Sequence, residues 1–244
     1  MGKDRADNRV VALGLADSRA KAQALILAGS VLDSNGHPVK KPGQQLESDA
    51  ELILKGESLP FVSRGGLKLD AALEHFSIDV QDRICLDVGA STGGFTDCLL
   101  QRGAKTVYAL DVGYNQLAWS LRTDPRVVVH EKVNIRSATR EIVPDPVQLI
   151  VVDVSFISLR LVLPPALELA AEQCSIVALI KPQFEVGKEG VGKGGIVRDE
   201  ALREDVVAKL EAFLPDIGLE HRGTIPSPIT GAKGNREFLL YGCR

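Results

Sequence analysis

A glycine-rich segment directly after an apolar run is the part of this sequence best suited to bind a small molecule. Residues 84–86 are apolar, Asp87 follows, and the pattern Asp-x-Gly-x-x-x-Gly-Gly continues into a segment that can be helical. Glycines let backbone N–H groups face a ligand, and a helix start adds partial positive charge. A carboxylate would repel a pyrophosphate but suits the cationic amino-acid end of S-adenosylmethionine. A tight turn that merely requires glycine is the alternative. The predicted cofactor-binding residues of this segment are Asp87, Gly89, Ala90, Ser91, Thr92, Gly93, Gly94 and Phe95.

Polar residues also stand at the ends of the later predicted strands. Asp111 ends the second strand, where an acid can accept hydrogen bonds from both hydroxyls of a ribose. This feature alone does not separate NAD from S-adenosylmethionine. Asn134 follows the third strand and is predicted to lie beside an adenine edge. Together with the glycine-rich segment, these two residues complete the predicted cofactor site.

Two lysines and two carboxylates are predicted to converge on one face of the sheet. Asp153 and Lys181 end apolar strands, Glu237 begins the last strand, and Lys68 lies on the first helix of the second part. Methylation of a ribose 2′-hydroxyl requires a very weak acid to be oriented and to lose its proton. A lysine can act there as base or electrostatic guide while carboxylates hold it. For Lys181, a structural ion pair with Asp153 or a snorkelling side chain is the alternative.

The spacing of apolar runs predicts alternating strands and helices after residue 60. Continuous runs such as 149–152 and 176–180 are typical of buried parallel strands. A doubly wound sheet binds its ligands outside the strand C-termini, near the switch point. The predicted strands are 83–88, 106–112, 127–131, 148–154, 176–181 and 236–243, and the predicted helices are 65–76, 95–102, 115–122, 159–173 and 199–213.

Residues 1–60 have a different pattern of helix, strand and turn signals. They are predicted to form a small α+β binding module with a linker. Ser18 can cap a helix over 19–28, which Gly29 ends. Short strands are predicted around 31–32 and 39, joined by a turn at Asn35-Gly36, because Asn-Gly between apolar runs indicates a hairpin. A further strand is expected at 52–54, and 56–60 is expected to be a linker.

Composition narrows the class of protein. The 244 residues carry a formal net charge of -3, so no global basic field indicates nucleic acid, and any RNA contact must come from local patches. The four cysteines have no C-x-x-C spacing and are interpreted as reduced core residues of a cytoplasmic protein. The histidines have no metal-ligand spacing. The charged N-terminus predicts no signal peptide, and no apolar run has the length of a membrane helix.

The lysine and carboxylate positions resemble a known pattern. The chain resembles the FtsJ-type 2′-O-ribose RNA methyltransferases, whose Lys-Asp-Lys-Glu tetrad corresponds to Lys68, Asp153, Lys181 and Glu237. Over nearly its full length it resembles the TlyA family, also called hemolysin A. The strings that carry this resemblance are 63–69, 87–96, 109–117, 153–158, 181–185, 195–199 and 234–239. The resemblance implies a Rossmann-like methyltransferase domain over 61–244 that methylates cytidine 2′-hydroxyls of ribosomal RNA with S-adenosylmethionine, without metal.

The N-terminal module resembles the small RNA-binding domain of a small-subunit ribosomal protein, also found in tyrosyl-tRNA synthetases and pseudouridine synthases. Gly14, Ser18, Arg19, Asn35-Gly36 and Lys41-Pro42 are among the matching residues. Such modules place a basic helix face against structured RNA, through phosphate contacts that carry little sequence information. The implied partner is ribosomal RNA or a ribosomal subunit, and the short N-terminus points to the large subunit. The predicted RNA-binding residues are Arg9, Arg19, Lys21, Lys40, Lys41 and Arg64.

Other functions remain as alternatives. Residues 187–194 closely match the P-loop motif, but Gly194 occupies the position where that motif needs a Mg²⁺-binding hydroxyl. A mobile lid with Lys188 and Lys193 available to phosphates, or an ordinary loop, is expected there instead. An NAD(P) oxidoreductase would share Asp111 but lacks the Gly-x-Gly-x-x-Gly order. A haemolysin requires a membrane-active stretch that the sequence does not show. A non-enzymatic RNA-binding protein would keep the N-terminal module and has no use for the tetrad.

Overall fold

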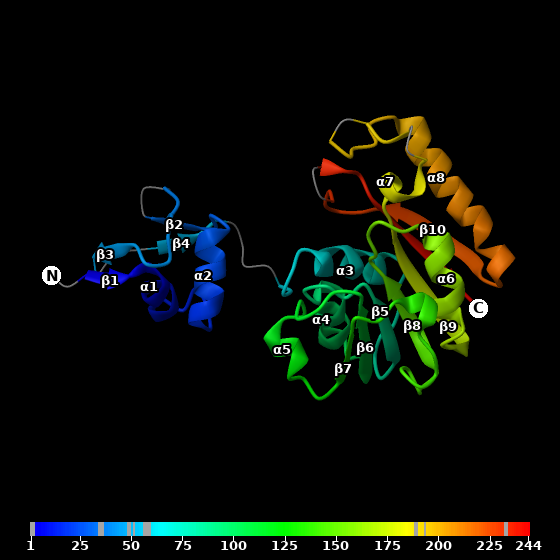
Figure 1. The fold of residues 1–244 in the computed structure, drawn as a ribbon, viewed down its shortest axis with the longest axis horizontal. Helices are drawn as coiled ribbons and strands as arrows, with labels where there is room; N and C mark the ends of the chain where they lie inside the picture. Colours follow the sequence, from blue (N-terminus) through cyan, green and yellow to red (C-terminus); the bar gives the residue numbers. More distant parts are fainter. Residues whose placement is uncertain are drawn as a thin grey trace. The chain divides into compact units, whose positions relative to one another are not determined.

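The chain divides into two compact units, Met1–Leu59 and Pro60–Arg244 (Figure 1). The computed structural model describes residues 3–33, 37–47, 50, 52–55, 60–187, 190–192, 194–231 and 234–244. The predicted turn at Asn35-Gly36, the linker residues 56–59, and Lys188 and Lys193 of the predicted lid lie outside the described residues. Each unit has a hydrophobic cluster of its own.

The first unit packs two helices against two small antiparallel sheets. In chain order its elements are β1 (Lys3–Arg5), α1 (Ala6–Ala12), α2 (Arg19–Leu27), β2 (Val31–Asp33), β3 (Gln45–Glu47) and β4 (Leu52–Leu54). Strand β1 pairs with β3, and β2 pairs with β4. The Ser18 hydroxyl accepts a hydrogen bond from the Lys21 N–H at 3.3 Å, so this residue caps α2 as its type predicts. Val10, Ala22 and Ile26 lie in the small core between the helices.

The hairpin predicted in this unit differs from the one observed. The strand partner of β2 is β4, and no strand is present at Val39. The chain nevertheless returns there, because Leu32 and Pro38 form an isolated antiparallel bridge and the Val39 N–H donates to the Val31 carbonyl at 2.9 Å. Helix α1 was not predicted, since its N-cap, Arg5, has no side-chain capping bond and gives no helix signal. Strands β1 and β3 were missed for the same lack of a local pattern.

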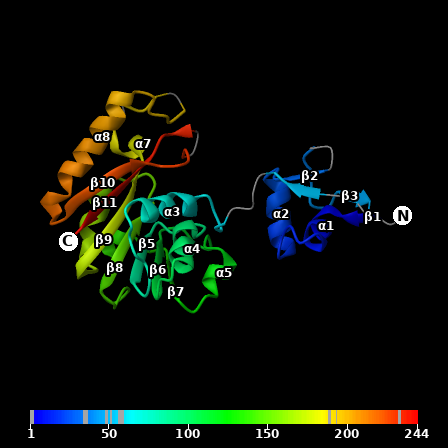
Figure 2. The ribbon, with the colours of Figure 1, turned by 180° about the vertical axis from the view of Figure 1, so that it is seen from behind.

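The second unit is built on a seven-stranded sheet in the order β10-β11-β9-β8-β5-β6-β7 (Figure 2). Strand β5 lies next to both β6 and β8, so the strand order reverses at β5. The five strands from β5 to β9 run parallel, whereas β11 is antiparallel to both of its neighbours. The bounds are β5 Ile84–Val88, β6 Thr106–Asp111, β7 Val127–Glu131, β8 Val147–Val152, β9 Ala170–Ile180, β10 Glu220–Pro226 and β11 Phe238–Cys243.

Helices cover both faces of this sheet, and alternate strand residues pack against each layer. Leu149 and Val151 of β8 share a cluster with Leu69 of α3 and Leu99 of α4. Ile150 of β8, one residue away, joins α6 and α8 on the other face. Residues 149–152 are buried on both faces of the sheet, which is why this part of β8 is a continuous apolar run. The helices are α3 Gly65–His75, α4 Gly94–Gln101, α5 Trp119–Arg122, η1 Ile135–Ser137, α6 Leu159–Leu167, α7 Pro182–Glu185, α8 Glu200–Phe213 and η3 Pro215–Ile217.

Two predicted helices of this unit are shorter than expected, and one strand was missed. The helix expected over 115–122 is confined to Trp119–Arg122. The helix expected over 159–173 ends at Leu167, and the chain from Ala170 onward is the first part of β9. Local helix preference there is overridden by pairing, because Ala170 lies opposite Val147 of β8. Strand β10 was not predicted. It contains Arg222, Gly223 and Thr224, which give neither an apolar run nor a clean alternation, and it lies at the edge of the sheet. The predicted α/β class with a mostly parallel sheet is confirmed.

Candidate active site

A cavity of about 510 Å³ opens at the C-terminal ends of β5, β8 and β9. This position, beside the strand where the order reverses, is where an open α/β sheet binds its ligands. Its size falls in the range of small-molecule sites. Its walls come from the start of α3, the loop after β5, the loops after β8 and β9, and the segment before β11. The lining residues are Ser63, Arg64, Gly65, Lys68, Gly89, Ala90, Ser91, Thr92, Gly94, Phe95, Asp153, Ser155, Lys181, Ile229, Thr230, Gly231 and Gly234.

The loop after β5 needs its glycines for close packing. Gly89 has φ +88°, and a Cβ there would lie 2.6 Å from the carbonyl oxygen of Asp153. Gly93 has φ +100°, and a Cβ there would lie 2.8 Å from Leu117 Cδ1 and even closer to Leu121. Both positions therefore exclude any larger residue on steric grounds alone. Backbone at Gly89 also lines the cavity, whereas Gly93 does not and supports the loop from behind.

Asp87 lies beneath this loop with no exposed surface. The Thr96 hydroxyl donates to Asp87 Oδ2 at 2.6 Å, while buried Oδ1 has no hydrogen-bond partner among the described residues. Burial raises the pKa of Asp87 to about 7, against the lowering effect of Thr96. Asp87 does not line the cavity. Buried carboxylate oxygens normally accept a hydrogen bond, so the unpaired Oδ1 indicates that a donor is missing from the ligand-free structure. This observation fits a ligand that brings a cationic group to the loop.

Asp111 fixes the loop from the next strand. Its Oδ2 accepts from the Ser91 N–H at 2.7 Å and its Oδ1 accepts from the Gly113 N–H at 2.6 Å. Each carboxylate oxygen retains a further lone pair, so the group can still accept from a ligand hydroxyl. Asn134 Oδ1 accepts from the Arg136 N–H at 3.1 Å and caps η1, and its place beside an adenine edge stays a prediction. Neither Asp111 nor Asn134 lines the cavity.

Two lysine–carboxylate pairs lie at the cavity. Lys68 Nζ donates to Glu237 Oε2 at 2.6 Å, although the two residues are 169 positions apart in sequence. Lys181 Nζ lies 2.6 Å from Asp153 Oδ1 and donates to Ser155 Oγ at 3.0 Å. The side chains of Lys68 and Lys181 are only 10% and 12% exposed. Lys68, Asp153 and Lys181 line the cavity, whereas Glu237 does not and reaches it through Lys68.

The sheet topology explains why these four residues meet. Asp153 and Lys181 directly follow neighbouring parallel strands, so they lie at the same edge. Glu237 directly precedes β11, and because β11 is antiparallel, its start lies at that edge too. Lys68 is on the first turn of α3. The ion pair that was an alternative interpretation for Lys181 is present, and its lysine still faces the cavity.

The predicted RNA-binding residues have varied surroundings. Arg9 Nε donates to the Ala50 carbonyl at 2.9 Å, and Lys21 forms a long ion pair of 3.5 Å with Asp17. Lys40 and Lys41 are exposed. Arg64, which belongs to the second unit, is exposed at the cavity and donates to the Thr230 carbonyl at 3.4 Å.

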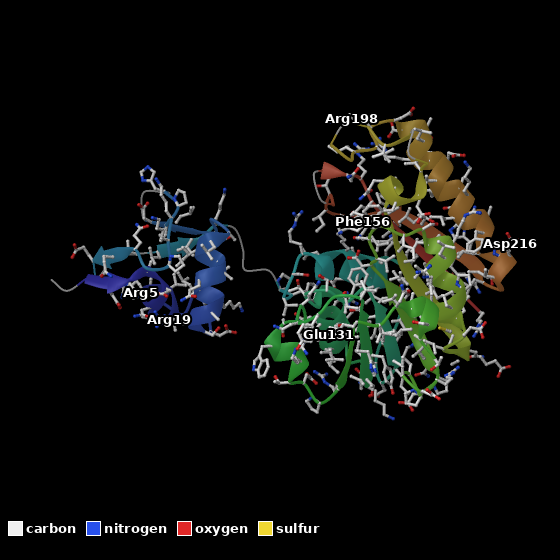
Figure 3. All side chains as sticks on the ribbon, viewed as in Figure 1. Arg5, Arg19, Glu131, Phe156, Arg198 and Asp216 are labelled. Carbon is white, nitrogen blue, oxygen red and sulfur yellow. The ribbon has the colours of Figure 1, made fainter. Side chains whose placement is uncertain are left out.

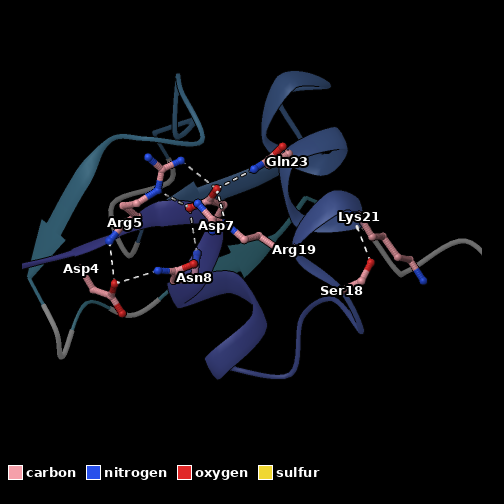
Figure 4. A network of polar contacts seen from close by, with 8 residues as sticks. All are labelled: Asp4, Arg5, Asp7, Asn8, Ser18, Arg19, Lys21 and Gln23. Carbon is pink, nitrogen blue, oxygen red and sulfur yellow. Dashed lines mark hydrogen bonds and ion pairs between the residues drawn. The ribbon is translucent and has the colours of Figure 1, made fainter.

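Arg19 belongs to a polar network around the fully buried Asp7 (Figure 4). Arg5 binds both oxygens of Asp7, each at 3.0 Å, and Arg19 Nε and Gln23 Nε2 donate to Oδ2 at 3.0 Å and 2.8 Å. The Arg5 hydrogen bonds in particular hold the pKa of Asp7 well below its usual range. The side chains of Arg5 and Arg19 are still 42% and 54% exposed, so each can reach an outside partner (Figure 3).

Sequence reasoning missed several residues of both regions. Arg5 and Asp7 carry no motif that marks them as partners. Ser155 stands in the Asp153-Val154-Ser155 string and could have been recognised from its place after the strand end. Ile229, Thr230 and Gly231 enter the cavity from the segment between β10 and β11, and missing β10 hid them.

None of the described helices is long and apolar enough to cross a membrane. In the same part of the chain, no group of three or more His, Cys, Asp or Glu side chains could hold a metal ion. Cys85, Cys98, Cys174 and Cys243 are free thiols.

Comparisons with known proteins agree with this geometry. Residues 61–244 match the model of the FtsJ-like methyltransferases, and residues 4–52 match the S4 domain. The chain is 50% identical to the Bacillus subtilis protein named "Putative rRNA methyltransferase YqxC", over 98% of this chain and 85% of that protein. It is 48% identical to the Mycobacterium tuberculosis "16S/23S rRNA (cytidine-2'-O)-methyltransferase TlyA", over 97% and 88%. The solved structure of a "Putative hemolysin from Streptococcus thermophilus" superposes with a TM-score of 0.77 at 46% identity, covering 100% of this chain and 89% of that one.

Proposed function

This chain belongs to the FtsJ-like methyltransferase family, and on that premise we propose that it transfers a methyl group from S-adenosylmethionine to a cytidine 2′-hydroxyl of ribosomal RNA. The observation that carries the proposal is the cavity with Lys181 and Lys68 at its wall, each paired with a carboxylate at 2.6 Å. Such a site suits a reaction in which a hydroxyl must be oriented and lose a proton. The substrate is ribosomal RNA, free or in a subunit, in the cytoplasm.

The loop after β5, residues 89–93, is called the glycine loop. We assign this loop and the acids around it to the cofactor. When bound, S-adenosylmethionine supplies an electrophilic methyl group on a sulfonium. The backbone from Gly89 to Thr92 forms one wall of the cavity, with the start of α4 directly after it. We assign Asp87 to the cationic amino-acid end, because its buried Oδ1 has no partner among the described residues. Asp111 is assigned to the ribose of the cofactor through its remaining lone pairs.

Lys181 orients the reacting hydroxyl and takes its proton. The bound cofactor would supply the methyl group to the 2′-oxygen and leave as a neutral thioether, and Lys181 would take the hydroxyl proton. Asp153, 2.6 Å away, stabilises the ammonium that results. Lys68 contributes positive charge near the developing oxyanion and is held by Glu237. No metal ion is required in this scheme.

The first unit is assigned to RNA binding. Arg19 and Lys21 on α2, with Lys40 and Lys41, offer charges to phosphates, and Arg64 offers one at the cavity mouth. Phosphate contacts of this kind position the RNA and weaken with salt. Arg5 joins this group, because the same buried carboxylate that holds Arg19 holds it.

The test is transfer of tritiated methyl from S-adenosylmethionine to purified small and large ribosomal subunits that lack the modification. The variant Lys181→Ala should abolish labelling of RNA and leave cofactor affinity nearly intact. Lys209→Ala is the matched control, since Lys209 is an exposed lysine paired with Asp205 on α8. Full labelling by Lys181→Ala would remove this residue from the mechanism.

A non-enzymatic RNA-binding protein is the rival class, and the same preparation separates the two. That class predicts loss of RNA binding in Arg19→Ala or Lys41→Ala, with no methyl transfer by the intact protein. Absence of cofactor binding by calorimetry would overturn the methyltransferase proposal. Cofactor binding without labelling would mean that ribosomal subunits are the wrong substrate.

A further inference from the structure

We propose that Ser155 is a positioning residue that sets the direction in which Lys181 presents its terminal nitrogen to the substrate hydroxyl. This inference rests on the proposed function, since it concerns the base of that reaction. The observation is the hydrogen bond from Lys181 Nζ to Ser155 Oγ, 3.0 Å long, at the wall of the cavity.

An ammonium group has three N–H donors that rotate together about the Cε–Nζ bond. The ion pair with Asp153 fixes where the nitrogen lies, because Coulomb attraction acts mainly through distance. A hydroxyl acceptor adds a direction, because a hydrogen bond weakens steeply away from linearity. When one N–H of Lys181 is bonded to Ser155, rotation about the Cε–Nζ bond is restricted. The other N–H groups, or the lone pair of the amine form, then point in a fixed direction into the cavity.

The loop that carries Ser155 is fixed at both ends. At its start, the Asp153 N–H donates to the Val88 carbonyl at 3.0 Å. At its end, the Ser158 hydroxyl donates to Glu185 Oε2 at 2.6 Å and the Leu159 N–H donates to Oε1 at 2.8 Å. Glu185 is on α7, the helix that begins directly after Lys181. The loop and the lysine are therefore tied to the same short helix.

The middle of the loop is also constrained. Phe156, labelled in Figure 3, has φ +65°, which is unusual for a residue with a bulky side chain. Its ring packs on Phe184 of α7 with centroids 4.9 Å apart. The residue that follows Ser155 is therefore held by a ring contact with the helix that begins after Lys181.

The exposure of Ser155 argues against a role in stability. The residue is exposed, and it lies in an irregular segment rather than in a helix or strand. Surface substitutions of this kind usually change stability little. The recorded partner of its hydroxyl is Lys181, so removing the hydroxyl removes an interaction with the base and leaves the core unchanged.

The experiment compares Ser155→Ala and Ser155→Thr with the intact full-length chain. In methyl transfer, Ser155→Ala should lower kcat about tenfold, because proton transfer depends on the aim of the base. The KM for RNA and the affinity for S-adenosylmethionine should not change. Ser155→Thr keeps a hydroxyl at the same carbon and should restore most of kcat. Ser120→Ala, an exposed serine on α5, is the control substitution. Equal kcat and KM values for Ser155→Ala and the intact protein would overturn the inference.

A readout independent of activity separates this inference from the proposed function. Lysine NH₃⁺ groups give ¹⁵N signals when hydrogen bonds slow their proton exchange, and Lys181→Ala identifies the signal of Lys181. Ser155→Ala should broaden or remove that signal, and Ser155→Thr should keep it. If the intact protein transfers no methyl group, the proposed function fails. The ¹⁵N measurement still shows whether Ser155 and Lys181 form their hydrogen bond. An unchanged signal in Ser155→Ala would overturn the assignment of Ser155.

Discussion

At the scale of single residues, the two fully buried carboxylates, Asp7 and Asp87, have opposite surroundings. Asp7 receives hydrogen bonds from two arginines and a glutamine, so its charged form is favoured. Asp87 receives one hydroxyl, at 2.6 Å, and burial favours its neutral form. The first is a satisfied structural group. The second remains short of partners, which is typical of a residue whose environment is completed by a ligand.

Asp87 should make the second unit less stable as pH rises. Its pKa of about 7 lies above the ordinary value of an aspartate, so between about pH 4 and pH 7 the folded state binds more protons than the unfolded state. Unfolding free energy from this group therefore falls as pH rises through that window. The variant Asp87→Asn has no charge at this position. The difference in unfolding free energy between this variant and the intact chain should therefore shift in favour of the variant by roughly 2–4 kcal/mol from pH 4 to pH 8.

Urea unfolding of the ligand-free protein at several pH values tests this point. Asp97→Asn is not a suitable control, because Asp97 accepts from the Val62 N–H at 2.8 Å. The exposed Asp216 of η3 is suitable. A stability difference between Asp87→Asn and the intact chain that is independent of pH would contradict the raised pKa.

At the scale of elements, the glycine loop joins three parts of the second unit. The Ala118 N–H before α5 donates to the Thr92 carbonyl at 3.0 Å. Gly94, the first residue of α4, packs against the segment that begins α3. The carbonyl of Asp153 after β8 approaches Gly89. The loop therefore cannot change shape without displacing its neighbours.

Gly93→Ala should disturb this arrangement without touching the cavity. A Cβ at Gly93 meets Leu117 and Leu121, and its φ of +100° is unfavourable for alanine. We expect a loss of about 2 kcal/mol in unfolding free energy and weaker binding of S-adenosylmethionine, measured by thermal unfolding and calorimetry. Gly187→Ala is the control, because nothing lies within 4 Å of its Cβ position and its φ is not positive. Equal binding by the two variants would show that Gly93 is a simple turn residue.

In the first unit, Asp7 connects the start of α1 to α2 and to β1. Asp7→Asn should lower its stability by roughly 2 kcal/mol at neutral pH, since hydrogen bonds to a buried charge are lost. Because the pKa of Asp7 is depressed in the folded state, this contribution is fully present above about pH 4 and is lost as pH falls below that value. Circular dichroism along an acid titration should show the intact chain and Asp7→Asn converging only below this pH.

The control for this prediction is Asp17→Asn, in which an exposed carboxylate leaves a 3.5 Å ion pair with Lys21. It should change stability little at any pH. If Asp7→Asn and Asp17→Asn behave alike, the buried network contributes nothing beyond a surface ion pair.

Elements built from strong local patterns could be predicted from the sequence, and those set by pairing could not. The runs at 84–86 and 149–152 are apolar because both faces of the sheet are covered there, so strands β5 and β8 were located closely. Residues 170–173 carry no such run, and β9 begins there because Ala170 pairs with Val147 of β8. The tetrad was predicted to converge because each member stands at a strand end or helix start. The partner choice within it, Lys68 with Glu237, depends on the antiparallel insertion of β11, which no local pattern reveals.

At the scale of the whole molecule, each unit has its own core. The cluster around Val10, Ala22 and Ile26 contains no residue of the second unit. The two clusters on the faces of the large sheet contain no residue of the first. We therefore expect the second unit to fold on a core of its own.

A chain that begins at Pro60 should fold and bind S-adenosylmethionine as the full chain does. Its KM for RNA should rise by about tenfold or more and depend less steeply on salt, because the phosphate contacts of the first unit are gone. Calorimetry and methyl transfer at two salt concentrations provide the measurements. An unchanged KM would assign RNA binding to the second unit alone.

The insertion of β11 between β9 and β10 has a consequence for the order of events during folding. Lys68 and Glu237 are 169 residues apart, so their pair depends on one of the most distant contacts in the sequence. The strands β5 to β9 already create the glycine loop, Asp153 and Lys181. A nascent sheet that lacks β11 should therefore acquire cofactor affinity before catalytic competence. Methyl transfer would then begin only after β11 has joined the sheet.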